Sequence, residues 1–87
     1  MKRVWLTERT YSDDEQNLII LEYATPDGKQ YLRQEKALTS FDDTSEIPAS
    51  LEVNENRLGK VREEDVEENR KRVENTRREY GAGENIS

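Results

Sequence analysis

The stretch LIILEYATPDGKQYL, residues 18–32, combines the most apolar run of the chain with a tight turn. An unbroken run of branched aliphatic residues bounded by turn formers is typical of a buried strand. In the turn, Pro26 presets φ at the second position and Gly28 supplies the positive φ that returns the chain. The stretch therefore predicts a β-hairpin, and its first strand, residues 17–25, is the expected centre of a sheet.

Segments on both sides of this hairpin carry the period-two pattern of strands. Residues 2–11 alternate and are rich in β-branched and aromatic side chains, and residues 29–38 alternate in the way expected near a sheet edge. Residues 51–54 also alternate, although Ser50 before them could equally cap a turn of helix. We favour the short strand for residues 51–54 and expect an antiparallel meander of three or four strands.

The last expected element is an α-helix over residues 61–80. No glycine or proline interrupts it, acidic residues crowd its first turns, and Arg77 and Arg78 lie in its last turn. Gly81 stands where a glycine in the left-handed conformation often ends a helix. Local effects alone therefore favour this helix.

A narrow apolar stripe runs along the expected helix, because Val66, Val73 and Tyr80 recur at intervals of seven. Two readings fit the stripe. It could be a short seam that pairs with a second helix, or it could dock the helix on the chain's own sheet. Both readings leave most of the helix surface to charged side chains.

Eighty-seven residues are enough for one hydrophobic core and too few for two. We therefore expect a single α+β domain over residues 1–81, in which an antiparallel three- to four-stranded β-meander is followed by one C-terminal α-helix. The polar residues 82–87 are expected to form a disordered tail.

The charge balance is acidic, with 14 lysine and arginine residues against 20 aspartate and glutamate residues and a net charge of -6. Such a charge disfavours long-range attraction to nucleic acid or to an anionic membrane. The excess of arginine over lysine on this acidic background suggests adaptation to high salt. No segment is apolar enough to span a membrane and none resembles a signal peptide, so we expect a cytoplasmic protein.

Several kinds of active site are excluded by residue types that the chain lacks. There is no cysteine and no histidine, which removes thiolate nucleophiles, zinc fingers and the commonest general base. The acidic clusters at residues 13–15 and 42–43 lack the spacing of a calcium-binding loop, and no glycine-rich phosphate loop is present. We expect no enzymatic activity, no metal or other cofactor, and no small-molecule substrate.

The first strand carries the residues best suited to contact a partner. If its residues alternate without interruption, Trp5 and Tyr11 share a face with Arg3 and Arg9. Such a face could pair with a protein surface, or it could stack on the bases of single-stranded nucleic acid. The acidic net charge favours the protein partner.

We expect a non-enzymatic module for protein–protein interaction or self-association, acting as a homodimer or on another protein. The expected contact residues are Trp5, Tyr11, Val66, Val73 and Tyr80. One alternative is a single-stranded nucleic-acid binder that uses Arg3, Trp5, Arg9 and Tyr11. Another is an antitoxin-like acidic partner of a basic protein.

Overall fold

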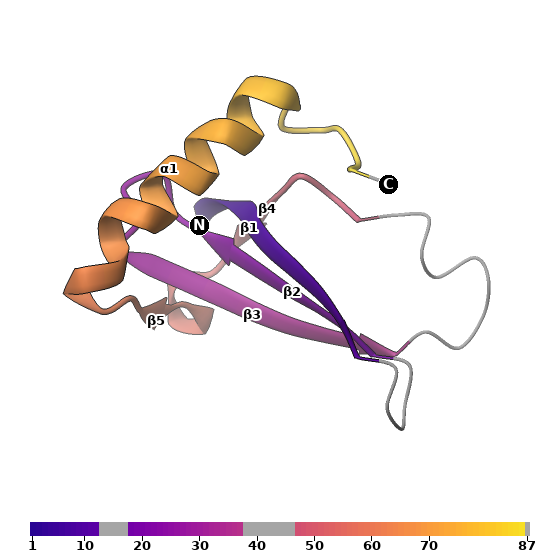
Figure 1. Ribbon diagram of the computed structural model, residues 1–87, viewed down its shortest axis with the longest axis horizontal. Helices are drawn as coiled ribbons and strands as arrows, with labels where there is room; N and C mark the ends of the chain where they lie inside the picture. Colours follow the sequence, from indigo (N-terminus) through magenta and orange to yellow (C-terminus); the bar gives the residue numbers. More distant parts are fainter. Residues whose placement is uncertain (13–17, 38–46, 87) are drawn as a thin grey trace.

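The computed structural model describes residues 1–12, 18–37 and 47–86, and there it places every side chain except those of Tyr11, Ser12 and Ala37. The described residues form one antiparallel sheet and one α-helix (Figure 1). The strands are β1 (Lys2–Ser12), β2 (Leu18–Ala24), β3 (Gln30–Ala37), β4 (Ser50–Val53) and β5 (Gly59–Lys60). A short 3-10 helix, η2 (Glu55–Arg57), and the helix α1 (Glu63–Glu79) complete the described elements.

The strand order β4-β1-β2-β3-β5 confirms the expected α+β fold, with a meander of β1, β2 and β3 followed by a C-terminal helix. Residues 51–54 were expected to form a short strand, with a turn of helix as the alternative. The structure contains both forms in succession, because β4 pairs with β1 and the 3-10 turn η2 follows it. The two-residue strand β5, which pairs with β3, was not predicted.

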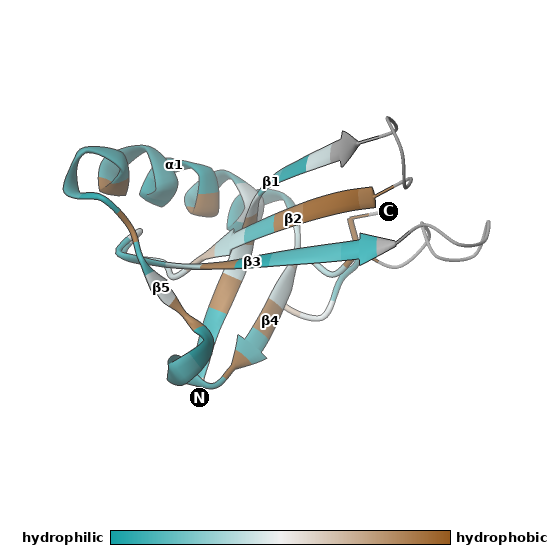
Figure 2. Ribbon diagram, turned by 90° about the horizontal axis from the view of Figure 1, so that it is seen from below, coloured by the Kyte–Doolittle hydropathy of each residue, from teal (hydrophilic) through white to brown (hydrophobic). Residues whose placement is uncertain are grey.

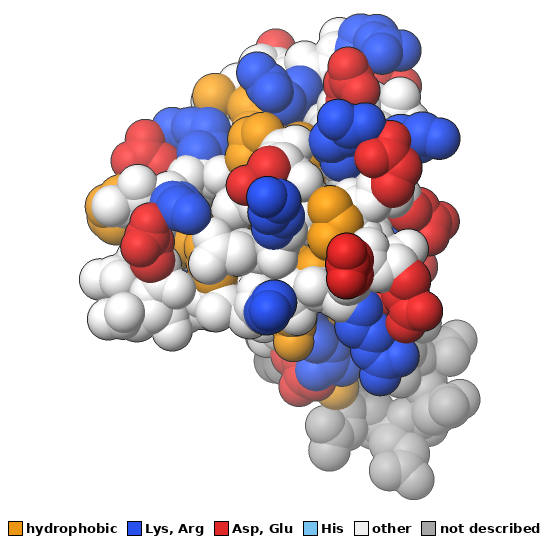
Figure 3. Space-filling view, turned by 90° about the vertical axis from the view of Figure 1, so that its left-hand side faces the viewer, with side chains coloured by type: hydrophobic (Ala, Val, Ile, Leu, Met, Phe, Trp, Pro, Cys, Tyr) orange, Lys and Arg blue, Asp and Glu red, His pale blue; other side chains and the backbone are white. Residues whose placement is uncertain are grey.

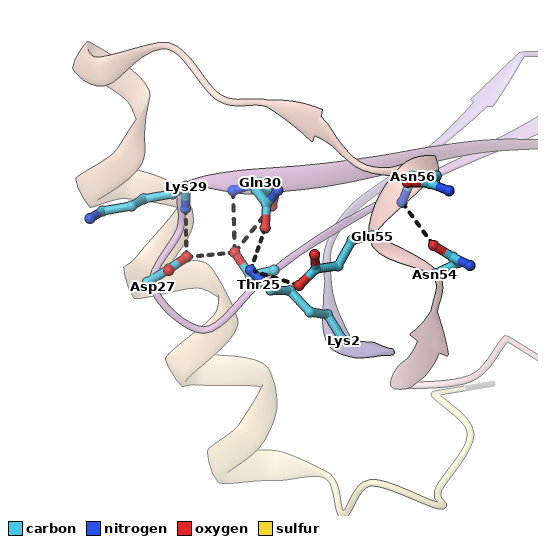
Figure 4. Close-up of polar contacts among 8 residues, drawn as sticks. All are labelled: Lys2, Thr25, Asp27, Lys29, Gln30, Asn54, Glu55 and Asn56. Atoms are coloured by element: carbon cyan, nitrogen blue, oxygen red, sulfur yellow. Dashed lines mark hydrogen bonds and ion pairs between the residues drawn. The ribbon is translucent and has the colours of Figure 1, made fainter.

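The hairpin turn forms as its sequence predicts, with Gly28 at a φ of 77° and its N–H donating to the Thr25 carbonyl at 2.8 Å. Asp27 fixes the turn from within: its carboxylate accepts from the Thr25 hydroxyl at 2.6 Å and from the Lys29 N–H at 2.9 Å (Figure 4). These two hydrogen bonds lower the pKa of Asp27. The turn is therefore held by side chains as well as by backbone geometry.

The main core lies on one face of the sheet, and α1 covers part of the other. Successive side chains of a strand point to opposite faces, so each face receives every second residue. The main core cluster comprises Val4, Leu6, Ile19, Leu21, Tyr23, Leu32, Ile47 and Val53. A second, smaller cluster comprises Trp5, Ala24 and Val73 of α1, which places the helix on the opposite face (Figures 1 and 2).

A β-bulge interrupts β1 at Thr7. Leu6 lies opposite Tyr23, but Glu8 already lies opposite Glu22, so the register shifts by one residue between them. A residue inserted in this way reverses which side chains face which side of the sheet. The alternation that holds for the first half of β1 is therefore inverted in the second half.

The helix α1 begins and ends close to the expected residues 61–80, but its C-terminus differs from the expectation. Tyr80 leaves the helix with extended backbone, at φ −132° and ψ 143°. Gly81 does not adopt the left-handed conformation, and its N–H donates instead to the Glu84 carboxylate at 3.0 Å. The expected glycine cap was wrong, because an extended residue and a side-chain acceptor end the helix here.

No helix in the described part of the chain is long and apolar enough to cross a membrane.

Residues 82–86 were expected to be disordered, and the structure instead pairs them with residues 47–50. The Ala49 N–H donates to the Glu84 carbonyl at 2.9 Å, and the Ile86 N–H donates to the Ile47 carbonyl at 2.7 Å. Ile86 also packs against the main core cluster. One apolar residue and a short ladder of backbone hydrogen bonds therefore order a segment that composition alone marks as a tail.

Candidate interaction surface

Trp5 was expected on an open surface, and the structure buries it. Its side chain is only 8% exposed and packs with Ala24 and Val73 beneath α1. The guanidinium carbon of Arg77 lies 5.7 Å from the centre of the indole ring, within the range of a cation–π contact. Trp5 therefore docks the chain's own helix and offers no free aromatic face to a partner.

The four residues of the nucleic-acid alternative do not form one surface. Because of the bulge at Thr7, Arg9 lies opposite Leu21 and shares its face, while Arg3 and Trp5 lie on the helix side. Arg3 is also engaged, since its guanidinium donates to the Ser50 hydroxyl at 2.7 Å and to the Glu52 carboxylate at 2.6 Å. Arg9 is exposed, and the side chain of Tyr11 lies outside the described residues. The predicted row of arginines and aromatics was wrong because the bulge divides it between two faces.

The heptad-spaced stripe of α1 turns toward its own domain. Val73 is 1% exposed, and Val66 and Tyr80 are half-buried. The Thr76 hydroxyl, on the same side of the helix, donates to the Leu6 carbonyl at 2.7 Å. Of the two readings of the stripe, docking on the sheet therefore fits the structure, and Val73 is not free to form a seam with another helix.

The outward surface of α1 carries charges of both signs. Glu67 pairs with Arg70 at 2.6 Å and Glu68 pairs with Arg72 at 2.9 Å. Figure 3, which views the molecule from the side of β5 and the start of α1, shows basic and acidic side chains interspersed over that face. An anionic nucleic acid or a uniformly basic protein would meet both signs there.

Open hollows lie beside α1 and are lined by charged side chains. An open groove of about 360 Å³ separates α1 from the sheet, and a wider open hollow of about 900 Å³ lies beside the start of α1. The groove contains Glu22 and Asp65 as well as Arg33 and Lys60, again with mixed charge. The described residues contain no cluster of three groups able to hold a metal ion, and the two acidic clusters noted in the sequence lie outside them.

Tyr23 has the most perturbed pKa among the described groups, and its hydroxyl bonds to a backbone carbonyl that helps to hold the fold together. Burial raises the pKa of Tyr23 to about 12. Its hydroxyl donates to the Pro48 carbonyl at 2.9 Å, which ties β2 to the segment that precedes β4. Its environment is that of a core tyrosine.

The two outer edges of the sheet differ. The β4 edge is short, and residues 82–86 cover its beginning, where the Ser50 hydroxyl donates to the Ala82 carbonyl at 2.9 Å. The β3 edge is paired with β5 only at Gln30 and Tyr31 (Figure 1). Within the described residues, β3 is therefore unpaired on its outer side from Leu32 onward.

The hydrogen-bonding pattern of the hairpin identifies which backbone groups point outward from β3. Thr25 and Gln30 form a hydrogen-bonded pair, since the Thr25 N–H donates to the Gln30 carbonyl at 3.0 Å. Antiparallel pairs alternate between hydrogen-bonded and non-hydrogen-bonded, so the odd-numbered residues of β3 direct their N–H and C=O away from β2. The bonds from β5 agree, because the Val61 N–H donates to the Lys29 carbonyl at 2.9 Å. Arg33 and Glu35 therefore present free backbone donors and acceptors along this edge.

We name the outer side of β3 from Leu32 to Ala37 the open edge. The side chains of Arg33 and Glu35 are 48% and 50% exposed and lie 2.8 Å apart on the helix side of the sheet. The sequence showed an amphipathic edge strand, but these two residues were not singled out. The alternation of opposite charges on one face of that strand is the signal that could have identified them.

Comparison with known proteins gives a family but no activity. No curated protein and no solved structure matches the chain. A model described as a family of unknown function, DUF7967, matches residues 1–86. Because this match spans nearly the whole chain, the protein belongs to the DUF7967 family of unknown function.

Proposed function

We propose that this protein is a non-enzymatic self-association module that forms a homodimer through the open edge of β3. The supporting observation is the row of outward backbone groups at Arg33 and Glu35, which have no partner within the described residues. A free edge strand is a template for another strand, because its N–H and C=O groups are already aligned for a ladder. Pairing of two open edges would join the two sheets into one.

The contrast between the two edges of the sheet supports the choice of β3. The β4 edge has four residues and is partly covered by residues 82–86, whereas β3 has eight residues and is covered only at Gln30 and Tyr31. The surfaces first considered for self-association are also occupied, since Trp5 and Val73 are buried against each other. The outer side of β1 also has no strand partner from Thr7 onward in the described part of the chain, but the bulge at Thr7 interrupts its alignment there.

Light scattering on the purified chain, in moderate and in molar salt, tests this proposal. We expect a molar mass twice that of the 10.2 kDa chain. The informative variant is Arg33→Pro, because proline removes an outward N–H and leaves the ladder to β2 intact, a substitution that edge strands accept. We expect this variant to be a folded monomer.

Arg33→Ala is the matched control, because it also removes the charged side chain but keeps the backbone N–H. We expect Arg33→Ala to retain more dimer than Arg33→Pro at the same protein concentration. A wild-type monomer in both salts would refute the proposal and would mean that the charges on β3 protect the edge from pairing. An Arg33→Pro variant that remains as dimeric as the wild type would move the interface away from this edge.

A further inference from the structure

We infer that the partner on the open edge is a second copy of this chain, paired antiparallel in one register, with Gln34 opposite the partner's Gln34. This inference rests on the proposed self-association and adds to it the register of the two strands and the pairing of opposite charges across them. In this register Arg33 lies opposite the partner's Glu35, and Glu35 lies opposite the partner's Arg33. Three separate constraints select this arrangement.

The first constraint is the direction of the backbone groups. A two-fold axis between two identical antiparallel strands makes the central residue face its own copy. Outward residues must also face outward residues if they are to exchange hydrogen bonds, and in β3 these are the odd-numbered ones. With Gln34 at the centre, Arg33 and the partner's Glu35 are both outward and form a hydrogen-bonded pair. The symmetry-related pair does the same.

The second constraint is the position of β5. The outward groups of Tyr31 are occupied, because Tyr31 is the cross-strand partner of Gly59. Registers centred on Leu32, or on residues before it, need Tyr31 to pair with the second copy and are therefore blocked. Centres beyond Lys36 leave a single residue pair within β3, which is too short for a ladder. The centre of the dimer must then lie between Arg33 and Lys36.

The third constraint is charge. Within residues 33–36, Arg33, Glu35 and Lys36 are all charged, and each would face its own copy if it stood at the centre. Like charges directly opposite one another destabilise an antiparallel pair. Gln34 is the one uncharged residue of the four, and its register converts the charges on either side into reciprocal opposite pairs. The sequence of the open edge is therefore self-complementary in this register alone.

Cysteine cross-linking tests the register directly, since the chain contains no cysteine of its own. In the inferred register, Gln34→Cys places the two Cα atoms about 4.5 Å apart, within the range of a disulfide. Glu35→Cys places them about 8 Å apart, by the strand rise and spacing, which is too far for a disulfide. We expect Gln34→Cys to oxidise to a covalent dimer. The control is Lys36→Cys on the same face of β3, which we expect to stay uncrosslinked.

Charge reversal tests the pairing of Arg33 with the partner's Glu35. We expect Arg33→Glu and Glu35→Arg each to weaken dimerisation by roughly ten- to a hundredfold, since each replaces two opposite pairs with two like pairs. Mixing the two variants should restore association, because the doubly acidic edge of one variant then meets the doubly basic edge of the other. Both wild-type side chains are about half exposed, so neither substitution is expected to unfold the domain. Circular dichroism of each variant checks that it is folded.

The possible failures are distinguishable. Cross-linking through Glu35→Cys but not through Gln34→Cys would overturn the register while leaving association through the open edge intact. If Arg33→Glu and Glu35→Arg each dimerised as tightly as the wild type, and no better when mixed, the pairing of opposite charges would be overturned. A wild-type chain that is monomeric by light scattering, or a dimer that Arg33→Pro leaves unchanged, would remove the proposed function itself and this inference with it.

Discussion

Substitution of Thr76 tests whether the helix compensates for the point at which β1 stops pairing with the segment before β4. The Leu6 N–H donates to the Ala49 carbonyl at 2.9 Å, but the Ala49 N–H donates to the Glu84 carbonyl and does not return a bond to Leu6. The Leu6 carbonyl is satisfied instead by the Thr76 hydroxyl at 2.7 Å. A hydroxyl on α1 thus replaces the backbone donor that a regular antiparallel pair would supply.

Thr76→Val removes this donor with little change of shape, because both side chains are β-branched and similar in helix propensity. Leaving a buried carbonyl without a partner costs about 1 to 3 kcal/mol, and the added methyl group offsets less than ~0.8 kcal/mol. We expect a net loss of about 1 to 2 kcal/mol. For a domain of this size, that lowers the melting temperature by roughly 4 to 15 °C.

The matched control is Thr76→Ser, which keeps the hydroxyl and loses one methyl group, at a cost of at most ~0.8 kcal/mol. Urea unfolding followed by the fluorescence of Trp5, the one tryptophan of the chain, measures both variants. If Thr76→Val were as stable as Thr76→Ser, the bond to Leu6 would contribute nothing that water does not supply, and the compensation by α1 would be refuted.

Two further predictions concern the hairpin and the core. Gly28→Ala should destabilise the domain by roughly 2 to 4 kcal/mol, because its φ is 77° and a Cβ would overlap the Val66 carbonyl oxygen. Gly83→Ala, which meets nothing within 4 Å, should stay within about 0.5 kcal/mol of the wild type in the same thermal melt. Burial raises the pKa of Tyr23 from 10.0 to about 12, so its contribution is complete below pH 10 and is lost as the pH rises toward 12. Tyr23→Phe should flatten the fall of stability measured by urea unfolding over that range, and an unchanged slope would contradict the assignment.

The parts of the fold that depend on neighbouring residues were predictable. Pro26 and Gly28 specify the hairpin turn through their own backbone preferences, and that turn fixes the register of β2 and β3. The helix could be predicted for the same reason, because its charge pairs and the absence of breakers act within a few residues. These elements needed no knowledge of distant contacts.

The parts that depend on distant contacts were not predictable. The bulge at Thr7 lies in the pairing of β1 with β2, and threonine itself is not a marker of bulges. The Leu6 carbonyl beside it is bonded by Thr76, a residue near the other end of the chain. Strand β5 is two residues long and exists because Tyr31 offers its outward backbone groups. Residues 82–86 are ordered by partners at residues 47–50. The prediction that placed Arg9 on the face of Trp5 was wrong because of the bulge at Thr7.

The cover that residues 82–86 place on the beginning of β4 has a consequence for assembly. A sheet with two free edges is divalent: each added copy exposes a new edge, and growth continues into a filament. In the described residues the cover leaves most of β4, and β1 after Trp5, without a further strand partner, so it shortens the second edge but does not close it. Five residues laid across residues 47–50 therefore reduce the length of strand that a third copy could pair with, and so favour a pair over a longer assembly.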